Sequence, residues 1–340
     1  MSKETLQWLE DNTLIGFTEK RGNAWHYRAG SNNHYEGAIP VADVESRLFN
    51  WSPVVVPFAG EVGEEYWPFA GKVAVFRSDN RQGLGVFGED YPNTDYKQRL
   101  IEPVANIVDQ SQGELACASA GLLQGGAVAW FQIEMPETVE TPAGFNIRPF
   151  LLATSSLNGK VSTTFKVGMT AVVCDNTLAM ALSELDSLTF KVKNTKNSPL
   201  RLGEARSALD IVFTVGDEWA KEIERLTNTT VSDEQWDKFL DDYAPLPDPE
   251  NKRGYTIKEK ERDALTLLWN KDERVTPWHG TALGVLQAGN TYNQHEARVN
   301  KRDGQEVSKA EQNFENFLMG KTEEQDNKIM TSLNRALVAA

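Results

Sequence analysis

The sequence predicts an α+β fold: a mainly antiparallel sheet of hairpins covered by helices, with a helical C-terminal third. Strand-like segments alternate with turn-forming residues between residues 53 and 173, and apolar residues recur at helical spacing from about residue 200. Short connections between successive strands favour antiparallel pairing over crossovers. We therefore divide the 340-residue chain into a β-rich core over 1–200 and a helical region over 201–340 that packs on it.

Three hairpins are expected to build one sheet. The last of them turns at Asn158-Gly159, the strongest short turn signal in the chain. A strand over 53–58 precedes the hairpins. The paired segments are 72–77 with 83–88, 115–122 with 127–134, and 150–155 with 161–173.

Helices are expected beside these strands. A short helix over 41–49 begins after Pro40, and a helix over 95–109 has an apolar face with Pro103 as a kink. Another helix is predicted just after Cys174, with the Asp or the Asn that follows as its cap.

The C-terminal third is predicted to be helical throughout. Ser232 opens a capping box, and further helices are expected over 203–226, 257–270, 281–299, 308–319 and 323–338. The last two helices have strongly apolar faces, which either fold back on the core or bind a neighbouring chain. On this basis we expect a homo-oligomer. The apolar residues are Phe314, Phe317, Leu318 and Met319 on one helix, and Ile329, Met330, Leu333 and Leu337 on the other.

Composition narrows the classes of partner. The chain has 35 basic and 49 acidic residues, a net charge of −14, which opposes nonspecific attraction to DNA or to an anionic membrane. No apolar run approaches the roughly 20 residues that cross a bilayer, and the N-terminus does not resemble a secretory signal. The two cysteines, Cys117 and Cys174, match no zinc or redox spacing. We expect a cytoplasmic protein.

One stretch is notably basic. Residues 191–206 contain five basic residues and one acidic residue, Glu204. The functional interpretation is contact with the phosphates of a single-stranded nucleic acid, and the alternative is a solvated loop beside acidic helices. The predicted nucleic-acid-binding residues are Lys191, Lys193, Lys196, Arg201 and Arg206.

Four other features each have a functional and a structural interpretation. Cys174 is either a nucleophile at a helix N-terminus or a buried small residue. The glycines at 121, 125 and 126 form either a phosphate cradle or a hairpin turn. The four histidines are either metal ligands or independent residues: His26, His34, His279 and His295. The aromatic residues of the N-terminal part either stack bases near Arg28 and Arg47 or pack in the core. They are Trp25, Tyr27, Tyr35, Trp51, Tyr66 and Trp67.

Five segments in sequence order resemble a known family. They are Asn33-His-Tyr-Glu-Gly-Ala-Ile-Pro-Val; Val75-Phe-Arg-Ser-Asp with Leu84-Gly-Val-Phe-Gly and Tyr91; Ala118-Ser-Ala-Gly-Leu-Leu-Gln-Gly-Gly; Val173-Cys-Asp-Asn-Thr-Leu; and Gly280-Thr-Ala-Leu with Asn290-Thr-Tyr-Asn-Gln-His. The chain resembles the phage/plasmid-like family called domain of unknown function 932. Ser119 stands where that family has an acid, Leu283 where it usually has Trp, and Gln294 where it has Asp. The resemblance implies a mobile-element context rather than a mechanism.

Three functions compete. The first is a non-catalytic single-strand binding or annealing factor in phage DNA metabolism, which the basic stretch and the implied context favour. The second is a factor that binds a host or phage protein, which suits the acidic charge and predicts an exposed apolar patch. The third, a hydrolase or nuclease, ranks last because the acids of 233–242 sit at solvent-type spacing on a helix. No catalytic residue, metal ligand or cofactor is predicted.

Overall fold

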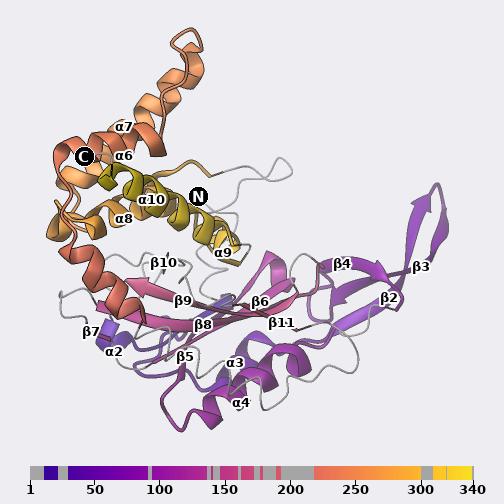
Figure 1. The fold of residues 1–340 in the computed structure, drawn as a ribbon. Helices are drawn as coiled ribbons and strands as arrows, with labels where there is room; N and C mark the ends of the chain where they lie inside the picture. Colours follow the sequence, from indigo (N-terminus) through magenta and orange to yellow (C-terminus); the bar gives the residue numbers. More distant parts are fainter. Residues whose placement is uncertain are drawn as a thin grey trace.

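The chain forms two antiparallel sheets, with helices on both faces of the larger one (Figure 1). This arrangement confirms the predicted α+β class. The computed structural model describes residues 11–21, 30–90, 94–135, 139–140, 146–159, 162–171, 177–178, 189–192, 218–299, 309–318 and 320–338.

The larger sheet has eight strands and only antiparallel pairings, in the order β1-β5-β6-β8-β9-β10, with β7 beside β8 and β11 beside β9. It contains the two predicted hairpins β5–β6 and β8–β9. The strands are β1 (Thr13–Ile15), β5 (Ala116–Leu123), β6 (Val128–Glu134), β7 (Val139–Glu140), β8 (Asn146–Ser156), β9 (Thr163–Ala171), β10 (Thr177–Leu178) and β11 (Thr189–Val192).

The smaller sheet corrects the prediction of one sheet. The expected hairpin at 72–88 pairs instead with the strand before it, giving the order β2-β3-β4. Gly85 of β4 lies so close to the turn after β8 that a Cβ there would be 2.7 Å from the Leu157 carbonyl oxygen. Strand β4 therefore packs on a turn of the larger sheet and does not pair with its edge. The strands are β2 (Pro53–Val62), β3 (Glu65–Arg77) and β4 (Gly83–Gly88).

The helices predicted beside the strands are present at 41–49 and 95–109. Helix α3 is Val41–Leu48, and a short α2 covers Thr18–Arg21. The second predicted helix begins as a π-helix, η1 (Lys97–Ile101), and continues as α4 (Glu102–Gln110). Pro103 is the second residue of α4, close to the point where the helix changes from π to α geometry.

The helix predicted after Cys174 is wrong at the two residues that the structure describes there. Thr177 and Leu178 form β10, paired with Thr170 and Met169 of β9. The edge of β9 offers these residues backbone partners, and such tertiary pairing overrides a local helix signal. The rest of that segment lies outside the described residues.

The described C-terminal residues are mainly helical, as predicted, whereas residues 203–217 of the first expected helix lie outside the described residues. Ser232 does form a capping box: its Oγ accepts from the Gln235 N–H at 3.2 Å, and Gln235 Oε1 accepts from the Ser232 N–H at 2.9 Å. Among the described residues, no helix has both the length and the apolar composition that a bilayer crossing needs. Residues 218–228 are helical, followed by α6 (Asp233–Tyr243), α7 (Lys252–Lys271), η3 (Thr276–Trp278), α8 (Ala282–Thr291), the π-helix η4 (Tyr292–Glu296), α9 (Lys309–Leu318) and α10 (Lys321–Val338).

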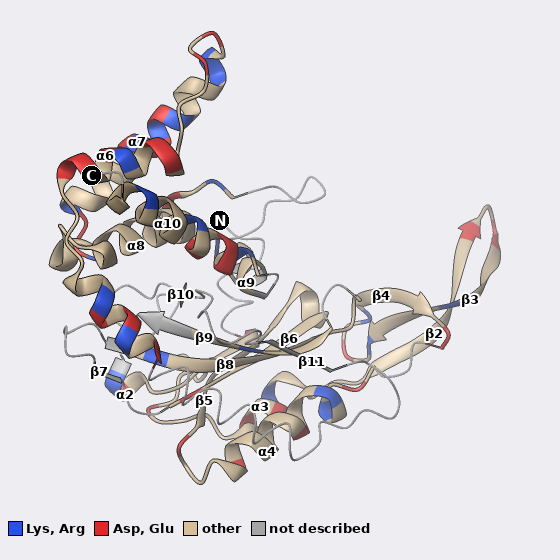
Figure 2. Ribbon diagram, in the orientation of Figure 1, with Lys and Arg blue, Asp and Glu red and all other residues tan. Residues whose placement is uncertain are grey.

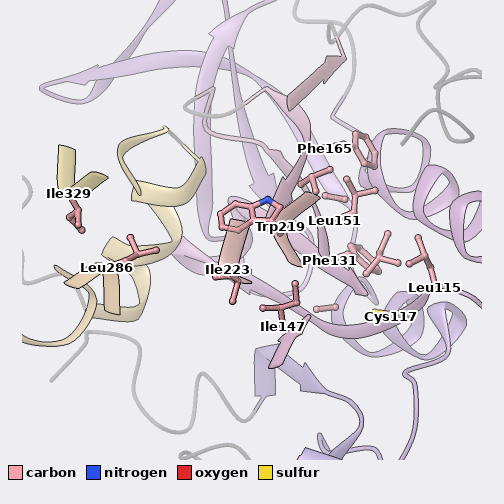
Figure 3. Close-up of a cluster of buried hydrophobic side chains, with 14 of the residues drawn as sticks. Leu115, Cys117, Phe131, Ile147, Leu151, Phe165, Trp219, Ile223, Leu286 and Ile329 are labelled. Carbon is pink, nitrogen blue, oxygen red and sulfur yellow. The ribbon is translucent and has the colours of Figure 1, made fainter. Parts of the chain in front are cut away.

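One face of the larger sheet is apolar across all of its central strands. A single row of paired positions runs Leu14, Ala120, Phe131, Ala153 and Phe165, and all five side chains are buried. Helices α3 and α4 lie on one side of the sheet in Figure 1, and α8, α9 and α10 lie on the other. Trp219 and Ile223 extend the same core from the sheet towards Leu286 and Ile329 of the C-terminal helices (Figure 3).

Three of the apolar residues predicted on the last two helices, Phe317, Ile329 and Leu333, pack within the chain. Phe317 of α9 is buried against Phe150 of β8, with ring centroids 5.4 Å apart, and Lys166 Nζ donates to the Phe317 carbonyl oxygen at 2.7 Å. Ile329 and Leu333 of α10 are fully buried in the main core. These residues are therefore not available for a second chain, and homo-oligomerisation stays a prediction that needs another surface.

The two sheets are joined by Arg77, a buried cation at the end of β3. Its guanidinium donates to Asp79 Oδ1 and Oδ2 at 3.0 and 2.7 Å, and to the Gly125 carbonyl oxygen at 3.1 Å. Gly125 belongs to the turn between β5 and β6, so this last bond connects the sheets. The guanidinium carbon also lies 4.3 Å from the centroid of the Trp51 ring.

Gly126 makes this close approach possible. Its φ is +98°, and a Cβ at this position would lie 2.8 Å from the Arg77 guanidinium and 3.2 Å from the Trp51 ring. The Gly126 carbonyl oxygen accepts from the Tyr96 hydroxyl at 3.1 Å. The turn between β5 and β6, which its glycines predicted, therefore also contacts the smaller sheet.

Replacing Arg77 with Met should destabilise the protein by about 2–3 kcal/mol, because it removes charge-assisted hydrogen bonds from a buried site. The Arg77 hydrogen bond holds the pKa of Asp79 below its usual range, so this stabilisation is present near neutral pH and is lost as the pH falls through the lowered pKa. Denaturant unfolding at pH 7 measures the loss. Lys72→Met, on an exposed position of the same strand, is the control and should cost no more than about 0.5 kcal/mol. Equal losses in both variants would contradict this role of Arg77.

Candidate functional site

The smaller sheet extends beyond the body of the protein as a narrow two-stranded ribbon (Figure 1). We call residues 58–70 the arm. It comprises the end of β2, a turn and the start of β3, and it lies beyond the point where the register between these strands shifts. Strand β4 pairs with β3 only at Lys72–Phe76, so it does not reach the arm.

The arm exposes large aromatic side chains. Tyr66 is 74% exposed, Trp67 58% and Phe69 59%, and Val62 beside the turn is also exposed. Aromatic side chains of this size are ordinarily buried or used in an interface, where each covers a large apolar area. Their exposure together on one ribbon distinguishes the arm from the rest of the described surface.

Local contacts explain how the arm holds its shape. Gly63 in the two-residue turn has φ +67°, which favours glycine. Trp67 pairs with Gly60 across the ribbon, and its Nε1 donates to Glu65 Oε2 at 3.1 Å. At the register shift the rings of Phe58 and Phe69 contact each other, with centroids 5.5 Å apart. An isolated two-stranded ribbon is only marginally stable, so these contacts and the anchored base of the sheet must support it.

The arm is acidic. Residues 58–70 contain three glutamates and no Lys or Arg, and the first basic residue after them is Lys72 at the base. Glu61, Glu64 and Glu65 are all exposed around the turn, where Figure 2 shows the acidic colour at the end of the ribbon. The arm therefore combines apolar aromatic surface with negative charge.

The predicted nucleic-acid-binding set is placed only in part. Lys191 lies in β11, where its backbone pairs with Thr164 of β9. The remaining residues, Lys193, Lys196, Arg201 and Arg206, lie outside the described residues.

The predicted aromatic cluster divides into two groups. Tyr35 and Trp51 pack against the main core, whereas Tyr66 and Trp67 are exposed on the arm. Arg47 donates to the Tyr35 hydroxyl at 2.9 Å, within the body of the protein. Trp25, Tyr27 and Arg28 lie outside the described residues.

The other candidate features have local partners. The described histidines are spread over the structure: the ring of His34 hydrogen-bonds the Asn33 side chain, that of His279 lies 4.5 Å from Trp269, and His295 sits in η4. Among the described residues no group of three or more His, Cys, Asp or Glu side chains could hold a metal ion. His26 and Cys174 lie outside this part of the chain. Burial and the nearby Glu134 raise the pKa of the Cys117 thiol to about 12.

Comparison with known families gives one match. The family model described as "Domain of unknown function (DUF932)" matches residues 83–315, more than two thirds of the chain. This chain belongs to the DUF932 family. No curated protein and no solved structure matches it. The match begins at β4 and includes every strand of the larger sheet except β1, and the arm precedes the matched residues.

Residues 290–295, the last of the segments that resemble the family, are partly buried between helices, and His295 at their end is exposed. Asn290 and Gln294 are almost fully buried in α8 and the π-helix η4. Lys309 Nζ of α9 donates to the Asn293 and Ala297 carbonyl oxygens at 2.8 and 2.7 Å, and Asn313 Nδ2 donates to the Gln294 carbonyl oxygen at 2.9 Å. In this geometry the motif attaches α9 to α8.

Helix α6 is tied to the same motif. The Tyr243 hydroxyl accepts from Asn293 Nδ2 at 3.1 Å, and burial raises the pKa of Tyr243 to about 12. Lys328 of α10 donates to the Tyr243 carbonyl oxygen at 2.8 Å. The sequence marks residues 290–295 only through the family resemblance, because their polar contacts join segments distant in the chain.

Proposed function

We propose that this protein is a non-catalytic binding protein that engages another protein through the arm. The exposed aromatic side chains of the arm carry the proposal. Large exposed apolar side chains mark interaction sites, and Trp and Tyr supply a large share of binding energy in protein interfaces. The sequence alone favours nucleic-acid binding, but exposed apolar surface is the feature that the protein-binding hypothesis predicts.

The charge of the arm favours a protein over a nucleic acid as its partner. Exposed aromatic side chains also suit base stacking, which normally occurs beside basic residues that track the phosphates. On the arm the neighbours of Tyr66 and Trp67 are glutamates, and the whole chain carries a charge of −14. Phosphates approaching this ribbon would be repelled.

A photoreactive amino acid at position 67 should crosslink to a partner protein in host cells. The matched control places the same amino acid at position 267 in α7, because Leu267 and Trp67 are both 58% exposed. We expect a discrete adduct from position 67 and none from position 267. Phe69→Ser, which removes a neighbouring aromatic side chain, should reduce the adduct. Gel mobility and mass spectrometry measure both results.

Two results would contradict the proposal. Equal adducts from positions 67 and 267 would show that exposure alone determines crosslinking. A nucleic-acid adduct from position 67 would show that the arm binds bases. An adduct with the mass of two copies would identify self-association.

Single-stranded DNA binding through residues 191–206 is the second candidate. The observation that favours it is the place of β11, whose only described strand partner is β9, so a lysine-bearing strand forms part of the sheet edge. Phosphate contacts from such an edge need no base specificity. The mobile-element context implied by the family resemblance is compatible with this role.

Replacing Lys191 and Lys193 with Glu should weaken single-stranded DNA binding for all sequences alike. Each lost phosphate contact should lower the log–log salt slope by about 0.7. Gel-shift titrations at two salt concentrations measure this slope, and thermal melting should be unchanged. Lys252→Glu with Arg253→Glu, at exposed positions of α7, makes the same charge change as a control. Unchanged binding in the Lys191 and Lys193 variant would show that the basic stretch is only a solvated loop and does not contact DNA.

A further inference from the structure

We infer that the arm captures an extended, basic segment of another protein as an added β-strand. This inference rests on the proposed function, because it names the chemistry of the partner that the arm binds. It depends on three properties of the arm: open strand edges, an aromatic side chain on each face, and exposed carboxylates.

The arm has two open edges. Residues 59–62 of β2 and 65–68 of β3 pair only with each other among the described residues, and β4 ends its pairing at Lys72. The Glu89 N–H donates to the Gly71 carbonyl oxygen at 2.9 Å, just where β4 leaves β3. Unpaired backbone groups along a strand edge are a template for another strand. An added strand could therefore pair with β3 along the arm, in line with β4 and beyond the point where the pairing of β4 ends.

Side chains of an added strand would meet aromatic rings on both faces. Successive residues of a strand point to opposite faces, so Tyr66 lies on one face of the ribbon and Trp67 on the other. Neighbouring strands place paired side chains about 5 Å apart, within reach of a large ring. Lys and Arg side chains are suited to these positions, since a cation over an aromatic ring is attracted to its face.

Charge decides between a basic segment and a second copy of this chain. Two arms in contact would bring six exposed glutamates together, and like charges on adjacent strands are destabilising. A segment rich in Lys or Arg would instead place its charges beside Glu61, Glu64 and Glu65, which are all exposed. On each face, apolar side chains or the aliphatic stems of these Lys and Arg residues would cover Tyr66 and Trp67. The complementary partner is therefore cationic, partly apolar and extended.

Selection from a library of random 12-residue peptides tests this partner chemistry directly. Peptides are selected on the full chain and depleted on the Trp67→Ser, Phe69→Ser variant, so that the survivors depend on the arm. We expect survivors enriched in Lys and Arg over the starting library. Substituting Glu61, Glu64 and Glu65 with Gln should weaken a selected peptide about tenfold, because exposed ion pairs contribute modestly. Glu259→Gln, exposed on α7, is the control and should leave the affinity unchanged.

The backbone mode has its own test. Two versions of a selected peptide are compared, one N-methylated at its odd-numbered residues and the other at its even-numbered residues. One version should lose binding and the other should keep it, because only alternate N–H groups of an added strand face the edge strand. Tolerance of methylation in both versions would overturn strand addition. Survivors with no basic enrichment, or a chain dimer in analytical ultracentrifugation that Trp67→Ser dissolves, would overturn the basic partner. If position 67 still crosslinks to another protein in those cases, the proposed function stands and only this inference fails.

Discussion

The position of the arm depends on the interactions of the buried Arg77 guanidinium. This group joins β3 to the turn of the β5–β6 hairpin through the Gly125 carbonyl oxygen, and it also stacks on the Trp51 ring. A buried cation is costly unless it is paired and hydrogen-bonded, and here Asp79 and the carbonyl meet both needs. The smaller sheet is thereby fixed to the larger one, and its outer end extends beyond the body of the protein (Figure 1).

The sequence predicted local features well because their signals are local. Asn158-Gly159 predicted the β8–β9 hairpin, and the Ser232 capping box predicted the start of α6. The separate smaller sheet was missed, because its separation depends on how Gly85 and Arg77 meet the larger sheet. The Val62-Gly-Glu-Glu-Tyr turn was a signal for the arm, yet the strand at 53 was expected to end at Phe58. Tyr66 and Trp67 were identified, but their exposure follows from the extension of β2 and β3 beyond the end of β4.

Polar residues serve different purposes in the interior and on the surface of this protein. Asn290 and Gln294 are buried in the segment 290–295, and Lys309 and Asn313 donate to backbone carbonyls of this segment, so it serves the packing of α8 with α9. The exposed arm, by contrast, is held by few contacts and ends in glutamates. A rigid body that presents a small aromatic ribbon fits a binding protein, because the anchored base reduces the conformational entropy lost when a partner is bound.

The central claim is that Arg77 holds the smaller sheet in a fixed position, and a distance measurement between the sheets tests it most directly. Spin labels at Val86→Cys in β4 and Asn106→Cys in α4 report that position, with Cys174→Ser in the background. Cys117 is buried and its thiol pKa is about 12, so it should not react with the label. The account predicts a narrow distance distribution that broadens in Arg77→Met. An equally narrow distribution in that variant would contradict it.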